Sequence, residues 1–421
     1  MKLHDEKVIQ QRIVGYIIRQ ERKKYKMKMT DFVEEFGKTR QYYSKIEHGE
    51  TALSFSTLQL IFDYLGISFD YSYYYEINDL FDDFIDYLFF SEYKEATDKL
   101  HEILSHENWK YSYSYPKVLL AEMFLKIMKE KPLHPINKSD FQLLESFYEE
   151  GQYLSLFYLC IGYSCFLRNE LETAIEWFHH ALHYAETLPL QGLCYLWLAI
   201  VNTMIHQYVY ALEYSQKASQ ISKQENNPQK DIIIQYYIGE IFSSLLYPKH
   251  AIKSFKTCIT IAKRLHREEW IKKAYIRLTW NALYSNDYNL VIQYGLAANN
   301  YFQDSNISFC LSYAYFMLDY QEEAQKYFNE INSKDKLLYL YKELLENLFA
   351  QDTSKQVNSL QKIYDYTSKY ELYPNYVFSC KALKELALQK QDYKEASRYV
   401  EDIIMLRKQI GAKQKVEYEI I

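Results

Sequence analysis

Two adjacent polar residues, Arg40 and Gln41, begin a short stretch whose spacing fits a helix. An arginine guanidinium can form two hydrogen bonds with the major-groove edge of guanine, and a glutamine carboxamide can do the same with adenine. Lys45 lies about one turn further on, and Tyr42 or Ser44 could reach bases or phosphates from the same stretch. These residue types in this order favour recognition of base edges in double-stranded DNA.

Two short helices joined by a tight turn are needed to present these side chains. Thr30 followed by Asp31 predicts the N-terminal cap of the first helix, and Gly37 supplies the break after it. Thr39 then caps the second helix, which Gly49 ends. The apolar residues at helical spacing are Phe32, Val33, Phe36, Tyr42, Tyr43 and Ile46.

Helices this short cannot bury their apolar faces alone, so flanking helices must complete the unit. The spacing predicts one helix over Ile13–Tyr25 and another over Phe55–Leu65. Residues 1–66 carry 12 Lys/Arg against 9 Asp/Glu, whereas the remainder carries 37 against 46. This charge distribution favours phosphate contact at the N-terminal end over the alternative, a four-helix cap whose basic face is merely solvated. The basic cluster consists of Arg19, Arg22, Lys23, Lys24, Lys26 and Lys28.

Over roughly residues 8–70 the sequence resembles the helix-turn-helix of the phage-repressor class, often called the Xre family. The matching positions are Arg19, Arg22, Phe36, Gly37, Thr39, Arg40, Gln41, Ser44, Lys45, Ile46, Glu47, Gly49, Leu58, Leu65, Gly66 and Ile67. The resemblance implies a recognition helix in the major groove. One departure is Asp31, where family members often carry glutamine and where an acid would repel a phosphate. The DNA-binding residues that we expect are Thr39, Arg40, Gln41, Tyr42, Ser44, Lys45, Arg19 and Lys28.

The composition favours helices throughout the chain. Glycine (10) and proline (7) are scarce among 421 residues, and 45 tyrosines suit helix–helix seams. The six cysteines include no CxxC pair, so we interpret them as small core residues in a reducing cytoplasm. The charged N-terminus is not a signal peptide, and there is no apolar run of about 18 residues. We expect a cytoplasmic protein without a membrane partner.

The rest of the chain repeats one pattern: a small residue, alanine twelve positions later, an aromatic residue four after that, and a small or aliphatic residue three further. The full copies are Gly162, Ala174, Phe178, Ala181; Gly239, Ala251, Phe255, Cys258; and Ser312, Ala324, Phe328, Ile331. Weaker copies begin at Phe84, Ala199, Thr279 and Lys384. Degenerate copies over about 107–150 and 335–370 would keep the array continuous.

This pattern is similar to the tetratricopeptide repeat, a helical hairpin of about 34 residues. Each hairpin needs its neighbours to bury its apolar face, so the array stacks into a superhelix with a concave inner wall. We therefore predict an all-α protein with a small N-terminal helix-turn-helix domain followed by a right-handed tetratricopeptide-repeat superhelix. The expected boundaries are residues 1–70 for the first domain, 71–80 for an ordered linker without Pro or Gly, and 81–421 for the repeats.

The combination resembles the RRNPP receptors of low-GC Gram-positive bacteria, of the Rgg, NprR, PlcR and PrgX kind. The resemblance implies a cytoplasmic transcription regulator that binds a short imported signalling peptide in the superhelix. The repeat half matches by pattern rather than by individual residues.

An extended peptide needs amide side chains for its backbone, apolar pockets for its side chains, and a cation for its C-terminal carboxylate. We expect Asn202 and Asn281 to supply the first, Trp280 with tyrosines the second, and Arg277 the third. An alternative is that most of these residues only pack between hairpins. The peptide-binding residues that we predict are Tyr163, Asn202, Tyr236, Glu240, Arg277, Trp280, Asn281 and Tyr313.

Other chemistry has little support. His179 and His183 have the i, i+4 spacing of metal ligands, but no third ligand is evident, and surface histidines explain them better. No Gly-rich phosphate loop or nucleophile elbow occurs. We expect no enzyme activity, cofactor or metal site.

Two classes of function remain. The first is a peptide-gated regulator that binds a DNA operator as a homodimer. The second is a protein-interaction scaffold, or a receptor that sequesters or dephosphorylates a response regulator, for which DNA binding is secondary.

Overall fold

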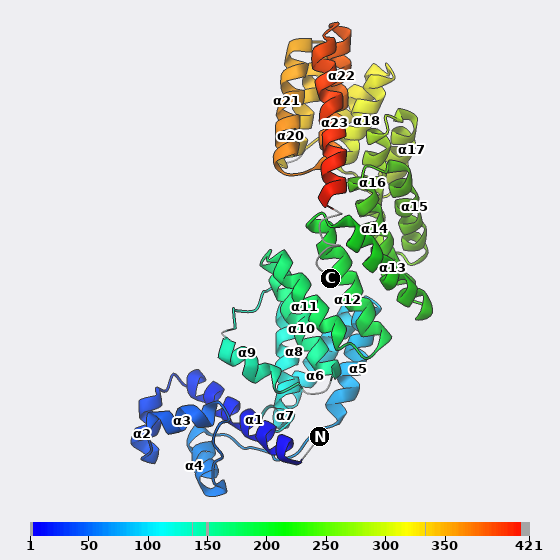
Figure 1. The fold of residues 1–421 in the computed structure, drawn as a ribbon. Helices are drawn as coiled ribbons and strands as arrows, with labels where there is room; N and C mark the ends of the chain where they lie inside the picture. The colour runs from blue at the N-terminus through cyan, green and yellow to red at the C-terminus, as the bar shows by residue number, and fades with distance from the viewer. Residues whose placement is uncertain (1–2, 137, 149–150, 333, 414–421) are drawn as a thin grey trace. The chain divides into compact units, whose positions relative to one another are not determined.

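The computed structural model describes residues 3–136, 138–148, 151–332 and 334–413, and in these ranges the regular elements are all α-helices, α1 to α23 (Figure 1). One isolated β-bridge joins Asp70 and Ser112. The predicted all-α fold, with a helix-turn-helix followed by a helical repeat array, is confirmed. None of the described helices is both long and apolar enough to cross a membrane.

Four helices form the N-terminal unit: α1 (Leu3–Lys24), α2 (Met29–Phe36), α3 (Arg40–Glu47) and α4 (Phe55–Leu65). Gly37 has a left-handed φ of 70°, as the predicted break requires, and the Thr39 hydroxyl accepts the Tyr42 N–H at 3.2 Å. The predicted Thr30 cap is wrong, because α2 already begins at Met29. Instead the Asp31 carboxylate accepts the Lys28 N–H at 2.6 Å and closes the first turn.

The segment between α4 and α5 (Glu76–Phe89) runs along residues 111–114. The Asp70 N–H donates to the Tyr111 carbonyl at 2.7 Å, and the Tyr74 N–H donates to the Ser114 hydroxyl at 2.8 Å. Because α5 begins at Glu76, the second half of the segment expected as a linker is helical.

Helices then follow in consecutive pairs. They are α5 with α6 (Tyr93–Ser105), α10 (Gly151–Leu167) with α11 (Leu171–His183), α12 (Leu188–Met204) with α13 (Tyr208–Gln224), α14 (Pro228–Ser244) with α15 (Pro248–Arg264), α16 (Glu268–Tyr284) with α17 (Tyr288–Asn299), α18 (Ser305–Met317) with α19 (Gln321–Asn329), α20 (Lys336–Phe349) with α21 (Thr353–Lys369), and α22 (Tyr373–Gln389) with α23 (Tyr393–Lys413). Between α6 and α10 lie α7 (Glu107–Lys110), α8 (Tyr115–Met128) and the short α9 (Lys138–Glu145) instead of a regular pair.

The turn within each pair contains a residue in the left-handed conformation, which fixes the register of the repeat. These residues include Asn169, His206, Leu246, Asn286 and Asp319, with φ between 57° and 65°. Five residues after each of them comes a predicted small or aliphatic anchor, and all five anchors are fully buried: Ala174, Ala211, Ala251, Val291 and Ala324. Gln351 precedes Gln356 by the same interval, so a polar residue holds the anchor position in the degenerate repeat of α20 and α21.

The small residue of the repeat pattern makes room for the aromatic residue, as predicted. A Cβ placed on Gly239 of α14 would lie 2.5 Å from the Phe255 ring of α15. The same geometry recurs between Gly162 and Phe178, at 2.7 Å. These contacts are too short for any side chain larger than hydrogen, so the glycines set the spacing of both hairpins.

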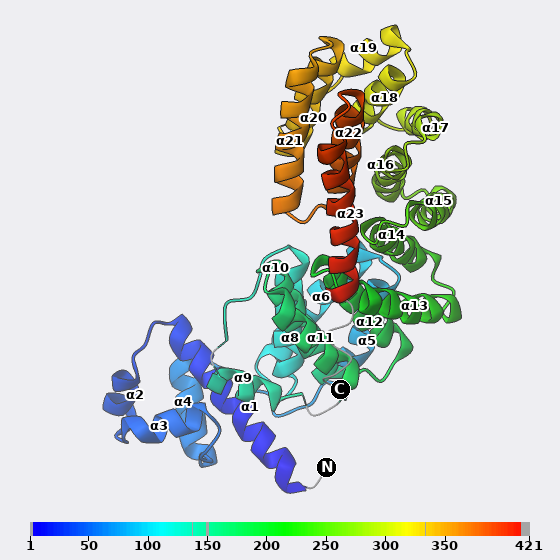
Figure 2. The same ribbon diagram turned by 45° about the horizontal axis from the view of Figure 1, so that its top comes forward.

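The chain divides into two compact units, Met1–Leu198 and Ala199–Ile421. The first contains the helix-turn-helix and the helices up to the first part of α12. In the second, α22 packs against α14 and α16 as well as against α21 (Figure 2). The last hairpin therefore covers the inner side of the helices that precede it in this unit.

All six cysteines are buried, free thiols, as the sequence predicted. Burial raises the pKa of Cys194, Cys258 and Cys380 to about 12. Because the thiolate is the reactive form, we expect no cysteine of the native protein to react within minutes with a thiol reagent such as DTNB at pH 8. All six should react once the chain is unfolded in guanidinium. Rapid reaction of a native cysteine would show that its helix pair opens readily.

Candidate nucleic-acid interface and candidate peptide-binding face

The N-terminal end of α3 presents the side chains that the sequence singles out for base recognition. Thr39, Arg40, Gln41 and Lys45 are exposed, whereas Tyr42 and Ser44 are half-buried. The α3 helix begins at Arg40, so the guanidinium and the neighbouring carboxamide stand on its first turn, next to the positive end of the helix dipole. This is the part of a recognition helix that meets base edges.

Buried aromatic residues hold α3 in place. Tyr43 and Ile46 point into the unit and are 1% and 3% exposed. The Tyr43 ring packs edge-on against Phe32 of α2, with ring centroids 5.7 Å apart, and Phe32 in turn contacts Tyr64 of α4. The exposed face of α3 is therefore backed by a rigid core.

A buried ion pair ties α3 to α1. The Arg22 guanidinium donates to both oxygens of Glu47, at 2.6 and 3.0 Å, and also to the Met27 carbonyl at 2.7 Å. Only 11% of the Arg22 side chain and 4% of the Glu47 side chain are exposed. The Glu47 hydrogen bonds raise the pKa of Arg22 above its usual value. These two residues of the sequence motif are thus structural partners.

The close approach of α1 to α3 depends on Gly15, a contact that was not predicted from the sequence. A Cβ at this position would lie 2.0 Å from the Ile46 carbonyl oxygen. No larger residue fits there without moving α3.

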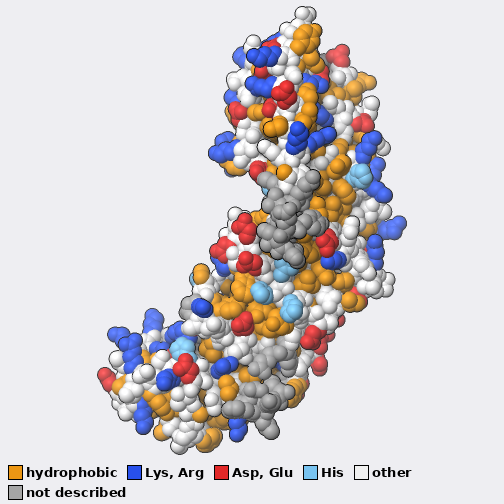
Figure 3. Space-filling view, in the orientation of Figure 1, with side chains coloured by type: hydrophobic (Ala, Val, Ile, Leu, Met, Phe, Trp, Pro, Cys, Tyr) orange, Lys and Arg blue, Asp and Glu red, His pale blue; other side chains and the backbone are white. Residues whose placement is uncertain are grey.

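Fewer residues of the predicted basic cluster are exposed on the surface than the sequence led us to expect. Arg22 is paired with Glu47, and Arg19 forms a bidentate ion pair with Asp140 of α9, which leaves 12% of the arginine side chain exposed. Lys24 is exposed and pairs with Glu21 at 2.9 Å. Lys23, Lys26 and Lys28 remain exposed, and lysine and arginine side chains stand out over the region of α1 to α4 (Figure 3).

In the second compact unit, most of the predicted peptide-binding residues are packing residues. Trp280 is 5% exposed and packs against the rings of Phe309 and Tyr341, with centroids 5.3 and 5.2 Å away. Tyr313 is 6% exposed and contacts Phe378 of α22 at 5.4 Å. Tyr313 also lines a pocket beside α22.

The two predicted amides are also buried. Asn202 and Asn281 are 2% and 1% exposed. The Asn281 carboxamide donates to the Arg277 carbonyl of its own helix at 2.9 Å. Both amides would have to be uncovered before they could bind a peptide backbone.

Three predicted residues do come together where solvent reaches them. Glu240 accepts from the Arg277 guanidinium at 3.0 Å, and the Tyr236 hydroxyl lies 3.5 Å from the same guanidinium. The Arg277 side chain is 46% exposed. The adjacent Glu240 carboxylate raises the pKa of Arg277, and burial raises the pKa of Glu240. A peptide carboxylate at Arg277 would therefore compete with Glu240.

Tyr163 belongs to the other compact unit. Its ring packs against Trp197 and Phe166, with centroids 4.5 and 5.8 Å away.

The second unit also contains a pocket of about 470 Å³, between α18, α20 and α22, which was not predicted from the sequence. Its walls include the apolar residues Phe316, Leu344, Leu348 and Phe378 together with Lys381. The Lys381 ammonium donates to the Tyr284 carbonyl at 2.8 Å, which anchors α22 to the end of α16. No repeat-based signal indicates this pocket, because α22 comes from a distant part of the chain.

These features define an all-α repeat protein with a helix-turn-helix unit at its N-terminus. Residues 18–72 match the helix-turn-helix family model, which confirms the Xre-like resemblance of this segment. No curated protein sequence matches the chain.

Solved structures of Rap proteins share the fold. A Rap protein complexed with competence and sporulation factor is 18% identical, with a TM-score of 0.56 over 80% of this chain and 99% of its own. Aspartyl phosphate phosphatase F from Bacillus subtilis is 16% identical, with a TM-score of 0.52 over 80% and 95%. The Rap conjugation gene regulator of plasmid pLS20, in complex with the Phr* peptide, is 15% identical, with a TM-score of 0.50 over 81% and 98%. The predicted resemblance to peptide receptors of this kind is thus confirmed for the fold.

Proposed function

We propose that the protein is a transcription regulator that binds an operator through α3 and is gated by a short signalling peptide bound by the repeats. The observation that carries the proposal is the exposure of Arg40 and Gln41 on the first turn of α3, in a unit that matches a helix-turn-helix model. Two of the solved structures with this fold are named for complexes, one with competence and sporulation factor and one with the Phr* peptide, which supports the second part.

The proposed regulator acts as a homodimer, because helix-turn-helix units usually read two half-sites related by two-fold symmetry. Peptide binding changes the arrangement of the repeat hairpins, and this change alters how the two recognition helices match the spacing of the half-sites. In the second unit, the peptide binds near Tyr236, Glu240 and Arg277, where the guanidinium exchanges Glu240 for the C-terminal carboxylate.

A response-regulator receptor is the second candidate. It is favoured by the similarity in fold to aspartyl phosphate phosphatase F. A mobility-shift assay on the upstream region of the protein's own gene distinguishes the DNA-binding regulator from the response-regulator receptor. Absence of retardation at low salt, with and without captured peptide, would favour the receptor. Mass spectrometry of short peptides that copurify with the full chain identifies the signal for the regulator.

Replacing Arg40 with alanine should weaken operator binding by about 1–3 kcal/mol, or roughly fivefold to 150-fold, because a bidentate contact with a base is lost. Binding to random-sequence DNA should change much less. The matched control is Arg407→Ala, which removes an exposed arginine from α23. If Arg40→Ala binds the operator as well as the control does, α3 does not read the operator through this residue.

A further inference from the structure

Arg19 has a different role in this structure from the phosphate contact that its sequence position implies. Both of its terminal nitrogens donate to the Asp140 carboxylate, the second at 3.2 Å. Only 12% of the Arg19 side chain and 21% of the Asp140 side chain are exposed. The partners are 121 residues apart in sequence, so the pair joins the DNA-binding unit to α9.

The pair belongs to a continuous route from the repeat helices to the recognition helix. Next to Asp140 on α9, the Phe141 ring packs on Phe157 of α10 and on Trp177 of α11, with centroids 5.5 and 5.0 Å away. One turn beyond Arg19 on α1, Arg22 binds Glu47 at the end of α3. A shift of the hairpin α10–α11 can therefore reach α3 through two ion pairs on one helix.

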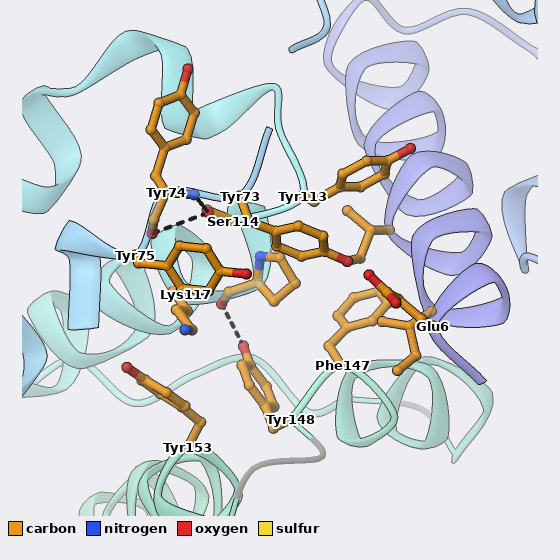
Figure 4. A pocket seen from close by; sticks show the side chains of 13 residues that line it. Glu6, Tyr73, Tyr74, Tyr75, Tyr113, Ser114, Lys117, Phe147, Tyr148 and Tyr153 are labelled. Atoms are coloured by element: carbon orange, nitrogen blue, oxygen red, sulfur yellow. Dashed lines mark hydrogen bonds between the residues drawn. The ribbon is translucent and has the colours of Figure 1, made fainter. Parts of the chain in front are cut away.

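Apolar contacts accompany the ion pair at the same junction. Tyr16 of α1 lies against Phe147 and Tyr115, with ring centroids 5.6 and 6.1 Å away. Beside it, Ile9 and Ile13 of α1 border a pocket of about 210 Å³ (Figure 4). The ion pair and these ring contacts together dock α1 against the residues around α9.

We propose that the Arg19–Asp140 pair is an autoinhibitory latch. Asp140 forms an ion pair with a cation of the DNA-binding unit that would otherwise contact a phosphate. Release of the pair, by movement of α9, makes Arg19 available to DNA. The proposal rests on the proposed DNA-binding function. It assigns the coupling between the repeats and the helix-turn-helix to one acid on α9.

The test measures the affinity of the full chain for a duplex of its own upstream region, and for a random-sequence duplex, at several KCl concentrations. Four variants are compared: Asp140→Asn, Arg19→Ala, the double variant, and Asp98→Asn. Asp98 is an exposed acid on α6, so its variant changes the net charge equally without touching Arg19. Circular dichroism and size exclusion establish that each variant is folded.

We expect Asp140→Asn to bind both duplexes several-fold more tightly than Asp98→Asn does. Its plot of log affinity against log salt should be steeper by about one, because each neutralised phosphate contributes about 0.9 to the slope. Adding Arg19→Ala should abolish the gain. An Asp140→Asn affinity equal to that of Asp98→Asn overturns the latch, and so does a gain that persists without Arg19. If the wild-type chain and every variant fail to bind either duplex, the proposed function itself fails and the latch fails with it.

Discussion

Glu47→Ala is expected to destabilise the helix-turn-helix unit by about 3–5 kcal/mol, since it leaves the Arg22 guanidinium buried without its counter-ion. Three hydrogen bonds of Arg22 now hold it between α1 and α3, and two of them go to Glu47. Water cannot readily replace the carboxylate, because only 11% of the arginine side chain is exposed. Hydrogen exchange of the amides in α1 and α3, measured by mass spectrometry, should be faster by roughly two to four orders of magnitude.

The control is Glu50→Ala, which removes an exposed acid just after α3. Replacing both partners by apolar residues, as in Arg22→Met with Glu47→Leu, should recover most of the stability, because the cost arises from one unpaired buried charge. Exchange in Glu47→Ala as slow as in Glu50→Ala would contradict this account of the pair.

The turn after α2 and the helices α3 and α4 of the helix-turn-helix unit could be predicted from sequence because their determinants are local. Gly37, Thr39 and the stretch Phe55–Leu65 mark turns, caps and apolar spacing within a few residues of one another. Arg19 and Arg22 were predicted as part of a basic surface. Their partners are 121 and 25 residues away, and no local pattern gives the distance between such side chains.

The role of Asp31 was also not predicted from the sequence, but here a residue expected to hinder DNA binding supports the fold. The sequence presents it as an acid placed where it would repel a phosphate. In the structure its carboxylate accepts the Lys28 N–H at 2.6 Å, at the N-terminal end of α2. The helix dipole favours a negative charge there, so Asp31 supports the element that precedes α3.

The repeat pattern was predictable because each hairpin buries an anchor at a fixed distance from its left-handed turn residue. The peptide-binding face was harder to predict from the sequence than the repeat pattern. Periodicity shows which side of a helix faces inward, but not whether another helix covers that side. In the second unit α22 does so: Phe378 lies against Tyr313 and Tyr341, and Lys381 reaches the Tyr284 carbonyl 97 residues earlier in the chain. Of the predicted set in this unit, the partly exposed cluster of Glu240 and Arg277 remains accessible, and Tyr313 lines the pocket beside α22.

Phe255→Ala is expected to destabilise the second compact unit by about 3–5 kcal/mol, because it removes a large ring from a site with no exposed surface. The ring fills the space that Gly239 leaves on α14, so its loss opens a cavity between α14 and α15. The unfolding free energy from urea titration of the full chain, followed by tryptophan fluorescence, measures the effect. A variant that adds a methyl group at the same contact tests the role of the glycine. Gly239→Ala gains helix propensity of about 0.5–1 kcal/mol, but its Cβ would lie 2.5 Å from the ring, and overpacking costs about 1–3 kcal/mol. We therefore expect Gly239→Ala to be less stable than wild type, and to recover when Phe255→Leu is added. If Gly239→Ala is more stable than wild type, helix propensity outweighs the close contact and the glycine does not set the spacing of this hairpin.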